Sequence, residues 1–501
     1  MKQILKKLYS QNVIIKITEI LFTIFLLFFP FKIDFLIANS NINITGKENI
    51  YQMHFISFSQ ILILLILIGI TLTSAINSKT KNIKKENLRK RSSIYQNFKL
   101  IIFIGGITLL ILNIVNSINI NNTAFNFIYI IEGISIYLII KSKLISRNRI
   151  INLILISSSI ISIIAITQFF IQHSIGHGLQ YFGEPQIAPD ILGVAKIDLQ
   201  NTKAIRPYGT FQHPNILAAY LGVCLVLISE KFIKSKNISK IQKSPHTKIK
   251  KMLNKIKLQS IFILILMGFI LTFSRSTYLA ITIVFLLQFL QYSKKKFIKN
   301  KNKKHTNKIK CKRNYKKYIA AFVIIIITAL TTTQIKIIKK TIQARATQNN
   351  QENFSLRKIY IQNSFTIISQ NFLTGIGLGN YTEEQPKISY TKLAPWDNQP
   401  VHNTELLLLS ELGVPLGSFI CILFLLTLIK NLKKDNHYFS KKAKSNIYLL
   451  IFILIISQFD HYFITNAQGR ELLAIVFGLY FYHNHSKTIY NQLHSSQVTA
   501  K

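Results

Sequence analysis

The chain has 501 residues, 49% of them hydrophobic, a mean hydropathy of +0.30 and a formal net charge of +44. The apolar residues come in blocks rather than in the alternating pattern of a soluble protein, which argues against a soluble fold. The basic residues lie in short stretches between those blocks instead of on one folded face, so the charge does not indicate a nucleic-acid partner.

The apolar blocks predict an all-α, polytopic integral membrane protein. A helix crosses the hydrocarbon core with roughly 20 residues, and in lipid every backbone polar group must be paired within its own segment. The N-terminal apolar run is too long for a cleaved signal peptide, so it is interpreted as the first span. The sequence predicts about twelve spans, at 17–36, 56–76, 99–117, 124–141, 150–172, 214–233, 259–274, 276–292, 318–334, 404–429, 446–463 and 470–483.

Lysine and arginine are concentrated in alternate loops of this arrangement. Two predicted spans separate each basic loop from the next, and basic loops remain on the cytoplasmic side. The pattern predicts an inner-membrane protein with both termini in the cytoplasm. The basic loops are 77–98, 141–149, 234–258, 293–317 and 430–445.

Two predicted external segments are too long to be simple turns, namely 173–213 and 335–403. Within the second, the apolar residues of 354–372 have the spacing of an amphipathic helix at the membrane surface. The chain is therefore divided into helices 1–9 with the first external loop (1–334), a large external loop (335–403), and the last three spans with a cytoplasmic tail (404–501).

Two arginines are expected on the external side, against the general bias of this chain. Arg206 precedes a predicted span, and Arg275 lies at a turn between two others. Arg275 either extends to lipid headgroups or presents a guanidinium that binds phosphate oxygens in a forked arrangement. Arg206 lies either in an ordinary entry loop before Pro214 or beside an anion bound at the helix start. His213 is interpreted mainly as a cap of that helix.

His402 is the candidate general base, because an imidazole titrates near neutral pH. If Asn403 or Thr404 caps the following span, Glu405 is close enough to orient the His402 ring. The alternative is an ordinary exposed loop histidine. Glu411 lies inside the same predicted span, where it either pairs with a basic group or marks a kink.

Other motifs are less informative. The run Gly375 to Asn380 lacks the spacing of a dinucleotide site and is interpreted as a close-approach turn. No metal-ligand spacing occurs, and no cofactor is expected. None of the three cysteines (Cys224, Cys311 and Cys421) falls in an expected external segment.

Four stretches in order resemble the O-antigen ligase superfamily, which includes O-antigen ligases, O-antigen polymerases and protein O-oligosaccharyltransferases. They are RPYGTFQHPNILAAY from Arg206 to Tyr220, TFSRSTYL from Thr272 to Leu279, the segment from Leu356 to Tyr381 that contains Arg357 and LTGIGLGNY, and HNTELLLLSELGVPLG from His402 to Gly417.

This resemblance implies transfer of a glycan from undecaprenyl pyrophosphate to an acceptor hydroxyl, in the manner of an O-antigen ligase. His402 would activate the acceptor, while Arg206 and Arg275, with Arg357 as a further candidate, would bind the pyrophosphate. His213, Glu405 and Glu411 would support the site. The acceptor would be an envelope component such as lipid A-core or another glycan.

Two other functions remain open. The first is a polysaccharide polymerase of the same superfamily, which carries the same motifs. The second is a polysaccharide transporter or flippase. Transporters often contain repeated halves and place ionisable groups near the bilayer midplane, and neither feature is visible in this sequence.

Overall fold

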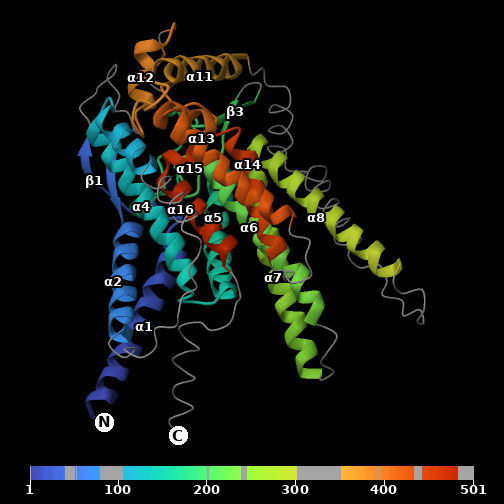
Figure 1. Ribbon diagram of the computed structural model, residues 1–501. Helices are drawn as coiled ribbons and strands as arrows, with labels where there is room; N and C mark the ends of the chain where they lie inside the picture. Colours follow the sequence, from blue (N-terminus) through green and yellow to red (C-terminus); the bar gives the residue numbers. More distant parts are fainter. Residues whose placement is uncertain are drawn as a thin grey trace.

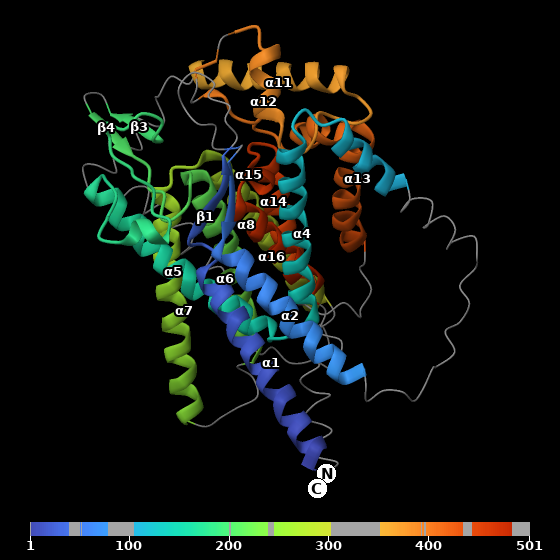
Figure 2. The same ribbon diagram turned by 90° about the vertical axis from the view of Figure 1, so that its left-hand side faces the viewer.

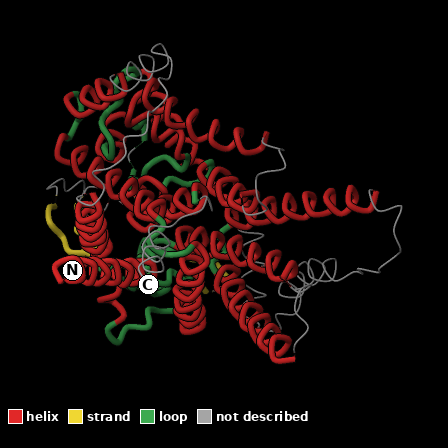
Figure 3. Tube along the Cα trace, turned by 60° about the horizontal axis from the view of Figure 1, so that its bottom comes forward, coloured by secondary structure: helices red, strands yellow, loops and turns green. Residues whose placement is uncertain are grey.

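The computed structural model describes residues 2–39, 51, 53–78, 105–199, 202–238, 245–301, 351–391, 393–394, 397–433 and 443–482. The described chain is mostly helical, as predicted, with two short antiparallel hairpins (Figure 3). The predicted span at 318–334 lies outside the described residues.

The long helices follow the predicted spans closely. The ends are set by turn and capping residues: Asn119 and Ser146 cap the starts of α4 and α5, and Asn466 caps α16 through its side chain. The helices are α1 Lys2–Phe28, α2 Phe58–Ser78, a helix at Gly105–Val115, α4 Ile120–Ser142, α5 Arg147–Ile171, α6 Pro214–Ile238, α7 Pro245–Leu271, α8 Arg275–Lys301, α11 Gln351–Gln370, α12 Tyr381–Ile388, α13 Thr404–Lys433, α14 Ala443–Ser457, α15 Tyr462–Thr465 and α16 Ala467–Phe481.

Five described helices are long and apolar enough to cross a membrane, judged by length and composition. These are Ile120–Ser142, Arg147–Ile171, Pro214–Phe232, Leu253–Leu271 and Thr404–Ile429. Apolar side chains on the outer faces of α2, α4, α7 and α13 are exposed, including Leu64, Ile131, Met267 and Leu426. Such apolar outer faces suit contact with lipid rather than water.

Helix α6 forms the centre of the bundle. In the most apolar segment of α6, 78% of the residues are buried, whereas the corresponding share is 22% in α7 and 28% in both α4 and α13. It packs against α5, α7, α8, α14 and α16 (Figure 1). A helix that is apolar on all sides is stabilised by burial on all sides, so α6 provides a fixed support for the loop that precedes it.

Two predicted spans are shorter than expected. The prediction of a span at 17–36 was wrong at its C-terminal end, because α1 stops at Phe28. Residues Asp34–Asn39 instead form strand β1, which pairs with β2 at Met53–Ser57. Pro30 explains the stop, since the residue before a proline avoids the helical region. In the span 446–463, α14 ends at Ser457 and a non-helical connection follows.

The segment 173–213 also contains an element that was not predicted. Residues Lys196–Leu199 (β3) and Thr202–Ile205 (β4) form a hairpin, after a short 3₁₀ turn at Leu179–Phe182. The hairpin leads directly into the Arg206 motif.

Helices α11 and α12 lie at the end of the bundle opposite to the start of α1, and α11 runs across the other helices (Figures 1 and 2). The helix predicted at 354–372 is therefore confirmed as α11. One face of α11 is buried through Tyr360, Asn363, Ser364 and Ile367, and the opposite face exposes Ile361 and Phe365.

Gly375 and Gly413 allow two backbone segments to touch. Helix α13 is kinked at Gly413, where φ is 77° and ψ is 164°, and the turn after α11 packs against the kink. A Cβ on Gly375 would lie 2.4 Å from the carbonyl oxygen of Glu411, and one on Gly413 would lie 2.6 Å from that of Leu373. The close-approach interpretation of the Gly375–Asn380 run is thus confirmed.

Candidate functional site

Three segments far apart in the sequence meet below α11 and α12. They are the start of α6, the start of α13, and the connection between α14 and α15 (Figures 1 and 2). They contribute Arg206, His213 and Asn215 from the first segment, His402 from the second, and Asp460 and His461 from the third. We call these six residues the His402–Asp460 site.

His402 stands directly before the first turn of α13. Asn403 caps that helix, because its Oδ1 accepts a hydrogen bond of 2.8 Å from the backbone N–H of Leu406. The Nδ1 atom of His402 lies 3.5 Å from Oδ1 of Asp460. Nδ1 itself is buried, while 21% of the side chain is exposed. The ring therefore faces a carboxylate on one side and is accessible on another.

Asp460 is held in place by groups on several segments. Its Oδ2 accepts a hydrogen bond of 2.9 Å from Nδ2 of Asn215, and its Oδ1 accepts one of 3.0 Å from the backbone N–H of His461. Thr404 also donates to the Asp460 carbonyl at 2.7 Å, which fixes the connection to the start of α13. The carboxylate is only 6% exposed.

Arg206 is connected to this carboxylate through Asn215. Its Nη2 donates to Oδ1 of Asn215 at 2.7 Å, and its Nε donates to the carbonyl of Thr272 at 2.7 Å. Thr272 belongs to the turn between α7 and α8, where Phe273 has a φ of 50°. Arg206 therefore connects three parts of the site: the α6 entry loop, the α7–α8 turn and the Asp460 carboxylate.

The Arg206 motif has its shape because buried side chains bind its backbone. Gln168 of α5 accepts hydrogen bonds from the N–H groups of Tyr208 and Gly209, at 3.0 Å and 2.7 Å. It also donates to the carbonyl of Gly209 at 2.9 Å. Gly209 has a φ of 61°, a backbone conformation that favours glycine, and it allows the tight bend in this loop.

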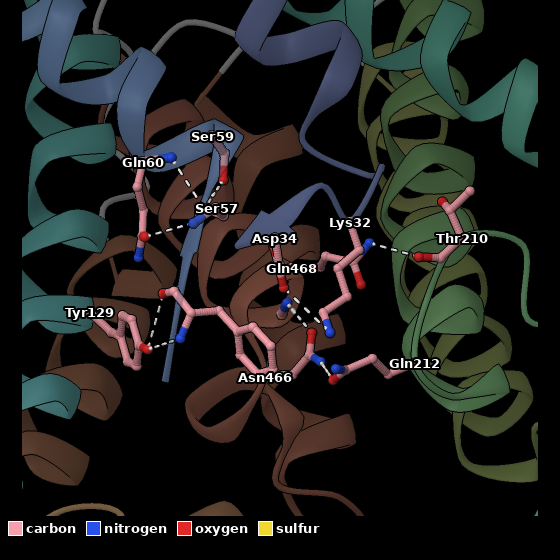
Figure 4. A network of polar contacts seen from close by, with 12 residues as sticks. Lys32, Asp34, Ser57, Ser59, Gln60, Tyr129, Thr210, Gln212, Asn466 and Gln468 are labelled. Carbon is pink, nitrogen blue, oxygen red and sulfur yellow. Dashed lines mark hydrogen bonds and ion pairs between the residues drawn. The ribbon is translucent and has the colours of Figure 1, made fainter. Parts of the chain in front are cut away.

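The next residues of the motif are held by the turn after α1 and by the start of α16. Thr210 and Gln468 both donate to the carbonyl of Pro30, each at 2.6 Å, and Gln212 accepts from Asn466. Figure 4 shows Thr210, Gln212, Asn466 and Gln468 in the same network as Lys32 and Asp34, which form an ion pair of 3.3 Å. The entry loop of α6 is thus hydrogen-bonded to the turn that follows α1 and to the start of α16.

Aromatic rings surround the two histidines. The rings of His402 and His461 lie 5.1 Å apart, Tyr360 of α11 lies 5.9 Å from His402, and Tyr51 lies 5.9 Å from His461. This arrangement places His402 between the bundle and the helix that runs across its end.

Burial determines which groups of the site carry charge. It lowers the pKa of His213 to about 3, with the positive charge of Arg206 acting in the same direction. Burial and the neighbouring His402 also lower the pKa of His461 to about 3. For Asp460, burial alone would raise the pKa, but the three histidines around it bring the pKa below its ordinary value. At neutral pH Asp460 is ionised, and His213 and His461 are uncharged.

His213, predicted as a helix cap, has that role. Its Nδ1 accepts a hydrogen bond of 3.1 Å from the backbone N–H of Asn215, and its carbonyl accepts from Ile216 and Leu217. Its ring also lies close enough to Asp460 and Arg206 for their charges to shift its pKa. His213 therefore belongs both to the helix start and to the site.

The acids expected beside His402 lie elsewhere. Glu405 accepts hydrogen bonds from Ser457 at 2.9 Å and Gln458 at 2.7 Å, so the carboxylate that contacts His402 is that of Asp460. Glu411 is buried and accepts a hydrogen bond of 3.3 Å from the backbone N–H of Tyr381. It lies two residues before the kink at Gly413, in agreement with the interpretation that Glu411 marks a kink.

Arg275 and Arg357 are exposed and lie at the edge of the site. Arg275 is the first residue of α8, three residues after the carbonyl that binds Arg206. Arg357 is on α11, and its charge acts on both Tyr360 and His461. The structure thus groups Arg206, His213 and His402 closely, with Arg357 nearby and Arg275 on the adjoining turn.

Asp460 and His461 were not identified from the sequence. They lie in Phe459-Asp460-His461-Tyr462, and an acid inside the predicted span 446–463 was the available signal. Asn215, which connects Arg206 to Asp460, was recognised only as one residue of the stretch from Arg206 to Tyr220.

Part of the chain is similar to a known protein family. Residues 260–421, about a third of the chain, match the family model described as O-Antigen ligase. No curated protein matches the chain. The matched segment contains Arg275, Arg357 and His402, and it ends before Asp460. It confirms the resemblance to the O-antigen ligase superfamily, whose ligases and polymerases it does not separate.

Proposed function

We propose that this membrane protein of the O-antigen ligase superfamily is a glycosyltransferase of the ligase type, which moves a glycan from undecaprenyl pyrophosphate to an acceptor hydroxyl. The observation that carries the proposal is the contact between His402, the last site residue of the family-matched segment, and the ionised Asp460. A histidine held against a carboxylate is suited to removing a proton from a hydroxyl group.

The proposed reaction begins at His402. Nδ1 of the ring is buried and faces Asp460, so Nε2 is the nitrogen that accepts the acceptor's proton. The oxygen of the acceptor then forms a bond to the anomeric carbon, and the bond from that carbon to the pyrophosphate oxygen breaks. The electrons of the broken bond leave with the pyrophosphate.

Asp460 stabilises the protonated form of His402 during this step. The imidazolium formed by proton transfer lies 3.5 Å from a carboxylate that is ionised at neutral pH. Because Asn215 and the His461 backbone already hold this carboxylate, little reorganisation is needed when the charge appears. Asp460 is thus a positioning residue in the proposal, and His402 is the catalytic residue.

The departing pyrophosphate requires positive charge that persists at every physiological pH, which guanidinium groups supply. Arg206 provides a buried positive charge within the site, and the exposed Arg275 and Arg357 lie at its edge. In the proposal, Arg275 and Arg357 contact the pyrophosphate directly. Arg206 holds the α7–α8 turn, which ends at Arg275, and adds to the local positive field.

The test is glycan transfer by purified protein in lipid nanodiscs, with a lipid-linked glycan and an acceptor from the native envelope. We expect His402→Gln to lower kcat by at least about 10²-fold, the usual contribution of a general base. The exposed His177, outside the site, provides the matched control His177→Gln, which should transfer at the wild-type rate. Wild-type activity in His402→Gln would refute the proposal.

The second candidate function is a polymerase of the same superfamily, because the family match is equally consistent with it. A deletion strain distinguishes the two. Lipid-linked polymer that accumulates without attachment indicates a ligase, whereas single repeat units without chain extension indicate a polymerase.

A further inference from the structure

His402, Asp460 and His461 form a cluster of potential metal ligands. One nitrogen or oxygen atom from each side chain lies within 4.8 Å of the corresponding atoms of the other two. The sequence showed no metal-ligand spacing, because two of these residues are adjacent in the chain and the third comes from the start of α13. The fold brings them together.

The spacing between His402 and Asp460 is that of two ligands of one ion. Their Nδ1 and Oδ1 atoms are 3.5 Å apart, whereas a charge-assisted hydrogen bond would bring them to about 2.7–2.9 Å. Two ligands at about 2.0–2.1 Å from a tetrahedral zinc ion lie roughly 3.3 Å apart. In addition, Nδ1 of His402 is buried and forms no hydrogen bond.

The other two ligands are already oriented by their neighbours. Nδ1 of His461 forms a hydrogen bond of 2.8 Å with the hydroxyl group of Thr465, which leaves Nε2 as the nitrogen for an ion. Asn215 holds the second carboxylate oxygen of Asp460 at 2.9 Å. Metal ligands in proteins are commonly fixed by such outer hydrogen bonds, which reduce the cost of forming the site.

We propose that this cluster binds one divalent transition-metal ion of the zinc type, through Nδ1 of His402, a carboxylate oxygen of Asp460 and Nε2 of His461. Two imidazoles and one carboxylate favour Zn²⁺ and its neighbours over Mg²⁺ and Ca²⁺, which prefer oxygen ligands. These three protein ligands leave a fourth position for water in the tetrahedral geometry that Zn²⁺ usually adopts.

The bound ion makes the enzyme inactive. An ion on Nδ1 of His402 uses the lone pair of that nitrogen, so the proton of the neutral ring must be on Nε2. Nε2 then has no lone pair with which to accept the acceptor's proton. This inhibition rests on the proposed function, whereas the metal binding does not.

Binding is measured first, on full-length protein in nanodiscs, purified without a histidine tag and without substrate. Co²⁺ is the probe, because a tetrahedral Co²⁺ site gives intense visible absorption bands. We expect one ion per chain, displacement by Zn²⁺, and affinity at least about tenfold weaker in His461→Gln and Asp460→Asn. The matched control His177→Gln should bind as the wild type does.

Wild-type protein without saturable, one-per-chain Co²⁺ binding would overturn the proposal, and this measurement does not depend on how the variants fold. Variants that elute as single species and bind Co²⁺ with unchanged affinity would also overturn it. To test the proposed inhibition, Zn²⁺ is added to the transfer assay. It should abolish glycan transfer, and EDTA should restore it. If Zn²⁺ binds and transfer continues, the inhibition is refuted. If transfer is absent even with EDTA, the proposed function fails while the metal site stands.

Discussion

Asn215 is hydrogen-bonded to Asp460, with 2.9 Å between Nδ2 of the amide and Oδ2 of the carboxylate. The oxygen of the same amide accepts from Arg206 at 2.7 Å. A neutral side chain therefore connects a buried cation to a buried anion, and it sets the orientation of both.

Asn215→Ala should damage the site without removing a charge. The change leaves Arg206 and Asp460 each without one hydrogen bond, and a hydrogen bond to a charged group contributes about 1.5–3 kcal/mol. We expect transfer to fall by roughly 10- to 100-fold, with a lower midpoint of thermal unfolding. Asn116 is exposed, with its amide bonded only within its own helical turn, so Asn116→Ala is the control.

Asp460→Asn tests the role of the carboxylate. The size of the side chain is kept, but the negative charge beside His402 is lost, so the imidazolium formed in the reaction is less stable. We expect kcat to fall by about 10²-fold or more, with a smaller change in KM. A rise in KM with an unchanged kcat would assign Asp460 to substrate binding instead. Asp190→Asn, an exposed acid outside the site, should leave both constants unchanged.

Gly375→Ala should destabilise the fold beyond the effect of its backbone angle. Gly375 and Gly176 have similar φ values, 66° and 73°, but a Cβ on Gly176 meets nothing within 4 Å. Gly176→Ala therefore measures the cost of the angle alone, about 1 kcal/mol. We expect Gly375→Ala to cost at least about 2 kcal/mol more, because its Cβ would meet backbone of α13 that cannot move easily. Equal unfolding midpoints for the two variants would contradict the close approach.

Acid should destabilise the site. The pKa values of His213 and His461 are lowered to about 3, so the folded protein excludes protons that the unfolded chain binds. Their contribution is complete above the unfolded pKa of about 6.5 and decreases as the pH falls toward 3, by at most about 1.4 kcal/mol per pH unit for each histidine. Unfolding midpoints measured between pH 7 and pH 4 should decrease, and less steeply in His461→Gln. An unchanged slope in that variant would be inconsistent with a neutral buried His461.

Most helices could be predicted because their signal is local. Apolar blocks of spanning length and the amphipathic spacing of α11 do not depend on what packs against them. The end of α1 and the two hairpins were missed because local apolar signals do not separate a helix from a strand that follows it. Phe35, Leu36 and Ile37 of β1 extend the apolar run of the preceding helix, and the local signs that the helix had stopped were Pro30 and the charged Lys32 and Asp34.

The site was predictable only in part. Arg206 and His402 stood out because their side chains suit a pyrophosphate and a hydroxyl group. Asp460 could not be selected in the same way, since its importance comes from burial beside three histidines from separate segments. Glu405 was the nearest acid in sequence, but the first turn of α13 directs it toward Ser457 and Gln458.

The dependence of the site on Asp460 also has a consequence for biogenesis. Arg206 and His402 are synthesised and can enter the membrane before the connection between α14 and α15 leaves the ribosome. Until that late segment docks against Asn215 and Thr404, the histidine has no carboxylate partner. Under the proposed function, a nascent or prematurely terminated chain therefore lacks a complete reaction centre, and only the finished protein consumes lipid-linked glycan.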